Sequence, residues 1–103
     1  MEIFSRTEKL IGKSALERLN NSRVAVFGVG GVGGYVVEAL ARSGVGALDL
    51  IDNDTVSESN INRQIIALHS TIGKQKTEVA AARVKDINPA IKVRTHNVFF
   101  IPE

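Results

Sequence analysis

The chain has no cysteine among its 103 residues, and this absence excludes several kinds of chemistry. A disulfide framework, a thiolate zinc site and a catalytic thiol cannot arise within this stretch, and a cysteine-free chain suits a cytosolic protein. The chain also has no large excess of one charge, since it contains 13 Lys and Arg residues and 11 Asp and Glu residues. The resulting net charge of +2 does not argue for nucleic-acid binding on charge alone.

Long apolar runs are missing too. No stretch approaches the ~20 apolar residues of a membrane-spanning helix, and the N-terminus lacks the apolar region of a signal peptide. We therefore expect a soluble, cytoplasmic protein. No repeat, low-complexity tract or linker interrupts the sequence. Its length suits one domain with a modest core, but is short for a complete doubly wound sheet.

A short apolar run, Val24–Phe27, leads directly into a group of glycines. Its β-branched residues suit a parallel strand that is buried on both faces. Gly28, Gly30 and Gly33 then fit the pattern GxGxxG, in which the first glycine permits a tight turn and the second lets backbone approach a phosphate. The third allows a helix to pack closely on the strand. With Gly31 between them, these glycines predict a nucleotide-phosphate site at the start of a helix.

The elements that follow fit this interpretation. Val32–Ser43 has helical spacing and is followed by Gly44, a residue that can end a helix in the left-handed conformation. Ala47–Asp52 predicts a second strand with an acid at its carboxyl end, where Asp52 can bond a ribose hydroxyl. The alternative is a glycine-rich turn with an exposed aspartate.

Weaker signals place the remaining elements. S-x-x-E patterns at Ser5 and Ser14 predict two short helices with capping boxes before the first strand. We expect a short helix or turn over Ile61–Leu68, a helix over Thr71–Asn88 that ends before a proline, and a third strand over Lys92–Val98. The predicted fold class is α/β: a Rossmann-like three-layer half-sheet of parallel strands in the order β-α-β-α-β, preceded by N-terminal helices.

Polar and cationic residues after the second strand distinguish between nucleotides. Asn60, Arg63, Gln64 and Lys76 are expected near the carboxyl edge of the sheet, where ligands bind in open α/β folds. A triphosphate needs such neutralisation, whereas a nicotinamide dinucleotide needs mainly the helix N-terminus. The alternative for Arg63 and Lys76 is a solvated surface position.

These motifs resemble those of the ubiquitin-activating-enzyme-like adenylating superfamily. The matching stretches are GVGGVGG at Gly28–Gly34, D-x-D-x-V at Asp52–Val56, SNINRQ at Ser59–Gln64 and GKQK at Gly73–Lys76. Within the superfamily, NRQIIAL at Asn62–Leu68 and INP at Ile87–Pro89 are most similar to the tRNA threonylcarbamoyladenosine dehydratases. The resemblance extends from Phe4 to about Phe99.

The resemblance implies an ATP-binding, ThiF-type adenylating domain of which residues 1–103 form the N-terminal part. In such enzymes a carboxylate attacks the α-phosphate of ATP, pyrophosphate leaves, and a nucleophile captures the acyl-AMP. In the dehydratase branch the carboxylate belongs to a threonylcarbamoyl group on a tRNA adenosine, and internal capture gives a cyclic product with net loss of water. One alternative substrate is the C-terminal glycine of a ubiquitin-like sulfur carrier. An alternative of another class is a non-catalytic nucleotide- or NAD-binding fragment.

The resemblance also implies roles for individual residues. Gly28, Gly30 and Gly33 would approach the phosphates, and Asp52 would hold the ribose. The triphosphate-binding residues would be Asn60, Arg63, Gln64 and Lys76; of these, Arg63 and Lys76 are the catalytic candidates, because they would offset charge on the departing pyrophosphate.

Arg6 resembles an N-terminal arginine that in relatives reaches the ATP of a partner subunit, which implies a homodimer. The family's magnesium-binding aspartate would lie beyond residue 103, so the chain alone is expected to bind nucleotide at most. tRNA and a sulfur-transfer protein are the candidate partners of the whole protein. The apolar run Val98–Ile101 suggests a truncated domain and predicts that the isolated chain self-associates.

Several polar residues have two interpretations. Asp54 either caps the following turn or contacts ligand, and Lys74 is expected on the helix surface. His69 and His96 lack a metal-ligand set and are taken as structural or exposed. A further set of basic residues fits a solvated face better than a tRNA surface: Arg83, Lys85, Lys92 and Arg94.

Overall fold

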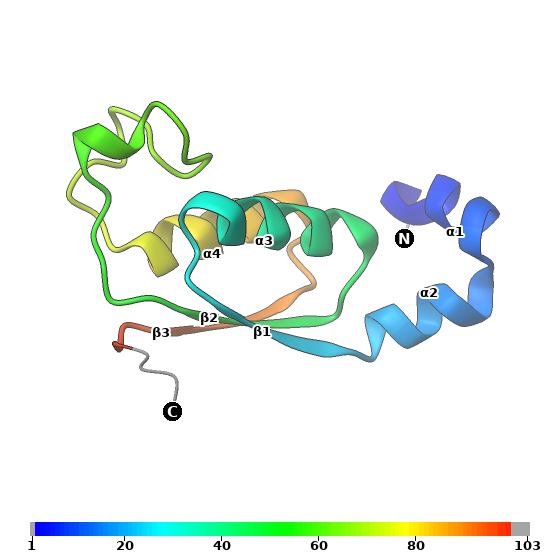
Figure 1. The fold of residues 1–103 in the computed structure, drawn as a ribbon. Coiled ribbons are helices and arrows are strands. Elements are labelled where there is room, and N and C mark those ends of the chain that lie inside the picture. The colour runs from blue at the N-terminus through cyan, green and yellow to red at the C-terminus, as the bar shows by residue number, and fades with distance from the viewer. Residues whose placement is uncertain (1, 100–103) are drawn as a thin grey trace.

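The computed structural model describes residues 2–99 and contains one sheet of three parallel strands (Figure 1). The strands β1 (Arg23–Phe27), β2 (Ala47–Ile51) and β3 (Lys92–His96) lie side by side in chain order. The helices α3 (Gly31–Ser43) and α4 (Lys76–Ile87) connect them and cover the same face of the sheet. The predicted α/β fold and its β-α-β-α-β order are confirmed, and the described residues supply the sheet and one helix layer.

The core lies between this helix layer and the sheet. Alternate strand residues point toward the helices, so the core combines side chains from both layers: Val26, Val37, Ala41, Leu48, Leu50, Ala80 and Val84. The opposite face of β1 is open within the described residues, where Ala25 and Phe27 are exposed. The prediction that this strand is buried on both faces is therefore wrong for residues 2–99, because only one helix layer covers it.

Three helical segments precede the sheet: η1 (Glu2–Phe4), α1 (Ser5–Ile11) and α2 (Lys13–Asn20). They lie at the amino ends of the strands, at the other end of the molecule from the glycine loop (Figure 1). None of the helices within residues 2–99 is long and apolar enough to cross a membrane.

The two helices α1 and α2 confirm the predicted elements but not the predicted caps. The N-cap positions are Phe4 and Gly12, and neither makes a side-chain cap hydrogen bond. Buried Phe4 ends the η1 turn, and Gly12 makes the junction with a φ of +89°. Ser5 and Ser14 therefore already lie inside their helices, where helical backbone prevents N-cap geometry.

The boundaries near the glycine loop agree with prediction better than those further along the chain. Gly44 ends α3 in the left-handed conformation, as expected. The helix predicted from Thr71 begins only at Lys76, since Gly73 has a φ of +86° and Gln75 forms a bridge with Thr55. The loop before it contains a short 3-10 helix, η2 (Glu58–Asn60), followed by turns.

Candidate functional site

The glycine loop joins β1 to α3 at the carboxyl edge of the sheet (Figure 1). Gly28 has a φ of +85°, and its N–H donates to the Ile51 carbonyl oxygen at 2.7 Å. A Cβ atom on Gly33 would lie 1.6 Å from the Gly28 carbonyl oxygen. Gly33 therefore has no room for a side chain, and its predicted role in close packing of the helix on the strand is confirmed.

The side-chain amide of Gln64 fills the space beside Gly30. A Cβ atom on Gly30 would lie 2.6 Å from Gln64 Oε1. This oxygen is buried and has no hydrogen-bond partner among the described residues. An unpaired buried carbonyl costs about 1–3 kcal/mol, so a polar ligand at the glycine loop would relieve an existing deficit.

The start of α3 faces the same place. Gly31 is its first residue, and the N-cap residue Gly30 makes no side-chain cap hydrogen bond. The first N–H groups of a helix lack intrahelical acceptors, and the helix dipole places partial positive charge there. This end of α3 therefore suits a phosphate group.

The carboxylate of Asp52 ties the glycine loop to the segment after β2. Its Oδ2 accepts the Val29 N–H at 3.0 Å, and its Oδ1 accepts the Asp54 N–H at 2.9 Å. Each carboxylate oxygen retains acceptor capacity, so a ribose hydroxyl could be added without breaking either bond. Asp52 thus lies beside the loop at the position that the sequence predicts.

Lys76 begins α4 and brings a buried ammonium group to this edge. Its backbone N–H donates to the Asp54 carbonyl oxygen at 3.0 Å, and its Nζ lies 3.9 Å from Asp54 Oδ2. The Asp54 side chain is itself 65% exposed. Lys76 is therefore held firmly but is only loosely neutralised, which leaves its charge available to an anionic ligand.

The predicted ligands Asn60 and Arg63 lie on the loop between β2 and α4. Asn60 is buried, and its Oδ1 accepts the backbone N–H of Ser57 at 2.9 Å, which shapes η2. The Asn60 carbonyl accepts the N–H groups of Arg63 and Gln64. The exposed Arg63 guanidinium donates to the Ser59 carbonyl oxygen at 3.1 Å. Asn60 thus shapes the loop that carries Arg63 and Gln64.

A hollow of about 210 Å³ lies beside the glycine loop at the ends of all three strands. Its lining combines apolar side chains with the carboxylate of Asp52 and the amide of Asn53: Phe27, Gly28, Ile51, Asp52, Asn53, Val98 and Phe99. Sites that bury a whole drug-sized ligand measure about 300–1,000 Å³, so this hollow suits a single ring system such as a nucleotide base.

Sequence reasoning missed the apolar walls of this hollow. Phe27 and Ile51 are identified above only as strand residues, and Val98–Ile101 only as a cause of self-association. Val98 and Phe99 are indeed exposed, while residues 100 and 101 lie outside the described part of the chain. The available signal was position, since all these residues end or follow strands that share one edge.

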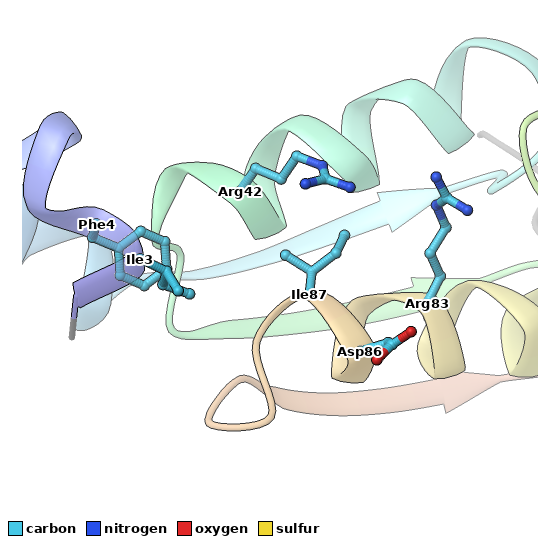
Figure 2. A pocket seen from close by; sticks show the side chains of 6 residues that line it. All are labelled: Ile3, Phe4, Arg42, Arg83, Asp86 and Ile87. Atoms are coloured by element: carbon cyan, nitrogen blue, oxygen red, sulfur yellow. The ribbon is translucent and has the colours of Figure 1, made fainter.

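The larger hollow shown in Figure 2 lies away from this edge, between η1 and the helices α3 and α4. Two of its residues, Arg42 and Arg83, are paired with Glu38. The hydrogen bonds from Arg83 are the main reason that the pKa of Glu38 is lowered. The carboxylate of Asp86 also lines this hollow, so with Glu38 two acids balance the two arginines and no cation is left over for an anionic ligand.

The set of basic residues weighed as a tRNA surface does not form one surface. Arg83 and Lys85 lie on α4, where Lys85 Nζ donates to the Ile91 carbonyl oxygen. Lys92 and Arg94 lie on β3, on the face of the sheet opposite the helices. His96 shares that face and lies 3.1 Å from Asp49, which also bonds Arg23. The Arg23 guanidinium, with a smaller contribution from His96, holds the pKa of Asp49 well below its usual range.

Arg6 is the one predicted site residue that the structure keeps apart from the others. It belongs to α1, at the amino ends of the strands, whereas the glycine loop lies at their carboxyl ends (Figure 1). The glycine loop, Asp52, Gln64 and Lys76 lie together at the carboxyl edge. One chain therefore assembles these elements without Arg6.

The chain is similar to known proteins over almost its whole length. The sequence model of the ThiF family matches residues 4–103. The tRNA threonylcarbamoyladenosine dehydratase of Bacillus subtilis is 53% identical over 100 residues, which cover 97% of this chain and 39% of that protein. A yeast relative, the adenylyltransferase and sulfurtransferase UBA4 of Lodderomyces elongisporus, is 41% identical over 81% of this chain and 18% of its own length.

A solved structure of a dehydratase shows the same similarity. The E. coli tRNA N6-threonylcarbamoyladenosine dehydratase TcdA, solved in complex with ATP, superposes with a TM-score of 0.95 at 44% identity. The match covers 98% of this chain and 42% of that chain. The chain thus spans about two fifths of the length of the dehydratases that it matches. Because the family model extends over almost all of the sequence, the chain belongs to the ThiF family.

Proposed function

We propose that the gene product that carries this chain adenylates a carboxylate with ATP, and that its substrate is the threonylcarbamoyl group of a modified tRNA adenosine. A carboxylate oxygen would bond to the α-phosphorus as the bond to the bridging oxygen breaks, and pyrophosphate would leave with that electron pair. An internal nucleophile would then attack the acyl carbon, lose its proton and release AMP. The ring closes with net loss of one water.

Residues 1–103 would supply the nucleotide-binding part of this reaction. The start of α3 would bind phosphate, Asp52 would bind the ribose, and the hollow at the strand ends would take the base. Lys76 and Arg63 would stabilise negative charge as pyrophosphate forms, and fixed cations stabilise a transition state in which charge develops. The buried, weakly paired Lys76 is the observation that favours a triphosphate over a nicotinamide dinucleotide.

Mg²⁺ is the expected companion of the triphosphate. Among residues 2–99, no group of three His, Cys, Asp or Glu side chains could hold a metal ion. The magnesium-binding aspartate that the resemblance to the adenylating family implies would lie beyond residue 103.

Release of pyrophosphate tests this function. The gene product is incubated with ATP, Mg²⁺ and tRNA that carries threonylcarbamoyladenosine, and pyrophosphate and cyclic product are measured. Lys76→Ala and Arg63→Ala should each slow the reaction about 10²- to 10³-fold, as for other groups that stabilise developing charge. Lys74→Ala removes an exposed lysine of the same loop and should leave the rate unchanged.

Two outcomes would contradict the proposal in different ways. Full activity of both Lys76→Ala and Arg63→Ala would refute the roles of these residues while leaving the reaction in place. An unsubstituted protein that releases no pyrophosphate with the modified tRNA would refute the reaction itself.

The similarity to an adenylyltransferase and sulfurtransferase supports a second candidate substrate, the C-terminal glycine of a ubiquitin-like sulfur carrier. Exchange of labelled pyrophosphate into ATP separates the two candidates, since only the true carboxylate substrate should stimulate it. Calorimetry that shows tighter binding of NAD than of ATP would contradict both.

A homodimer is the assembly that fits the position of Arg6. α1 lies at the other end of the molecule from the glycine loop, so an Arg6 that contacts ATP would contact the ATP of a second copy. This arrangement would make each site depend on two chains.

A further inference from the structure

Thr77 is a fully buried hydroxyl residue in the first turn of α4, directly after Lys76. Its Oγ1 donates a hydrogen bond to Oδ1 of Asn97. Asn97 is the first residue after β3, so this bond joins the start of α4 to the carboxyl end of a strand. The two ends lie at the same edge of the molecule (Figure 1).

Asn97 also begins the segment that forms one wall of the hollow beside the glycine loop. Its neighbours Val98 and Phe99 line the hollow, and the preceding His96 carbonyl accepts the Asp52 N–H at 3.1 Å. The wall is therefore held from two sides, by the backbone of Asp52 and by the hydroxyl of Thr77.

These contacts close a ring around the nucleotide edge. Starting from the glycine loop, Val29 bonds Asp52, Asp52 bonds Asp54, and Asp54 bonds the backbone of Lys76. Lys76 is covalently linked to Thr77, whose hydroxyl bonds Asn97. Asn97 is covalently linked to His96, and the His96 carbonyl accepts the Asp52 N–H, which closes the ring. The Thr77–Asn97 bond is the side-chain link that connects the cationic side of this ring to the apolar side.

We propose that Thr77 and Asn97 form a positioning clamp that fixes the spacing between the buried Lys76 ammonium and the apolar wall at Val98 and Phe99. Neither clamp residue needs to touch the nucleotide. The clamp keeps the phosphate-binding and base-binding parts at the separation that one ATP molecule spans. The proposal rests on the proposed nucleotide site.

A clamp of this kind has a distinct signature in binding. Two subsites at a fixed distance bind a ligand that spans both far better than they bind its halves, because the second contact is intramolecular. Loosening the clamp should therefore weaken the binding of ATP, while the affinities for adenosine alone and for tripolyphosphate alone should change little. General loss of structure would weaken all three.

Thr77→Val in the gene product that carries this chain tests the clamp, because valine keeps the shape and removes the hydroxyl. We expect the dissociation constant of ATP to rise about five- to tenfold, the effect of one lost hydrogen bond. Adenosine and tripolyphosphate should each stay within about twofold of the unsubstituted protein. Thr77→Ser restores the donor and should restore ATP affinity.

Three further variants complete the test. Asn97→Ala should weaken ATP binding as much as Thr77→Val does. The double variant should bind ATP no more weakly than either single variant, because both substitutions remove the same bond. Thr95→Val makes the same change at an exposed threonine of β3 and serves as the matched control.

The outcomes separate the clamp from the site. If Thr77→Val binds ATP as tightly as the unsubstituted protein, or weakens ATP, adenosine and tripolyphosphate equally, the clamp is refuted and the nucleotide site stands. If the unsubstituted protein binds no ATP, the proposed function is refuted and the clamp falls with it.

Discussion

At the scale of single residues, the glycines of the loop are constrained by different neighbours. Gly33 faces the backbone oxygen of Gly28, which cannot move without unwinding the turn, whereas Gly30 faces the end of the flexible Gln64 side chain. The repeated glycine pattern therefore combines a fixed steric requirement with an adjustable one.

Alanine substitutions should separate these two requirements. Gly33→Ala should lower the free energy of unfolding by about 3 kcal/mol or more, because a Cβ atom cannot fit against fixed backbone. Gly30→Ala should cost only about 1 kcal/mol, since the Gln64 amide can turn away. Urea unfolding followed by circular dichroism measures both, and equal losses would contradict this distinction.

At the scale of helices and strands, local signals set the elements near the glycine loop, and long-range contacts set the others. The start of α3 and its end at Gly44 follow from glycines within the segment itself. The helix α4 begins later than predicted because Gln75 bridges Thr55 and the Lys76 N–H bonds Asp54, two partners on the segment after β2. Sequence periodicity contains no information about such partners.

The same reasoning explains which part of the candidate site was predictable. The elements proposed to bind phosphate are contiguous motifs, so their residue types and spacing could be recognised. The apolar hollow combines the ends of three strands, and Phe27, Ile51 and Phe99 become neighbours only after the sheet forms. The Thr77–Asn97 bond likewise joins residues that no motif connects.

The contact between α3 and α4 contains a carboxylate whose effect depends on pH. Glu38 on α3 accepts hydrogen bonds from Arg83 on α4 and from Arg42, and the Arg83 bonds contribute most to its lowered pKa. A carboxyl group with a lower pKa in the folded state stabilises the fold above its unfolded pKa, and this contribution is lost as the pH falls through the folded value.

Glu38→Gln should therefore lower the free energy of unfolding by about 0.5–1 kcal/mol at pH 7, since the pair is partly exposed. The difference from the unsubstituted protein should shrink as the pH falls below 4.5, the ordinary pKa of the group, because Glu38 is then increasingly protonated in both states. Denaturant unfolding at a series of pH values measures this, with Glu17→Gln on exposed α2 as the control. A difference that is as large in acid as at pH 7 would contradict the assignment.

At the scale of the whole molecule, the two ends of the sheet have different characters. The carboxyl edge carries the glycine loop, Asp52, Lys76 and the apolar hollow, whereas the amino edge carries the N-terminal helices (Figure 1). The helix α1 has no buried residue, and Leu10 is 84% exposed. This weakly packed end is where Arg6 lies, far from the site that it is proposed to serve.

Mixing two inactive variants tests whether Arg6 acts on a second copy. In a dimer of Arg6→Ala and Lys76→Ala chains, one site would combine the intact Lys76 of the first chain with the intact Arg6 of the second. Random mixing makes half of the dimers mixed, each with one complete site, so pyrophosphate release should recover to about a quarter of the unsubstituted rate. Each variant alone should stay inactive, and so should a mixture of Lys76→Ala with the double variant, in which no site is complete. If Arg6 acts within its own chain, the mixture of the two single variants stays inactive as well, because neither chain then holds both residues.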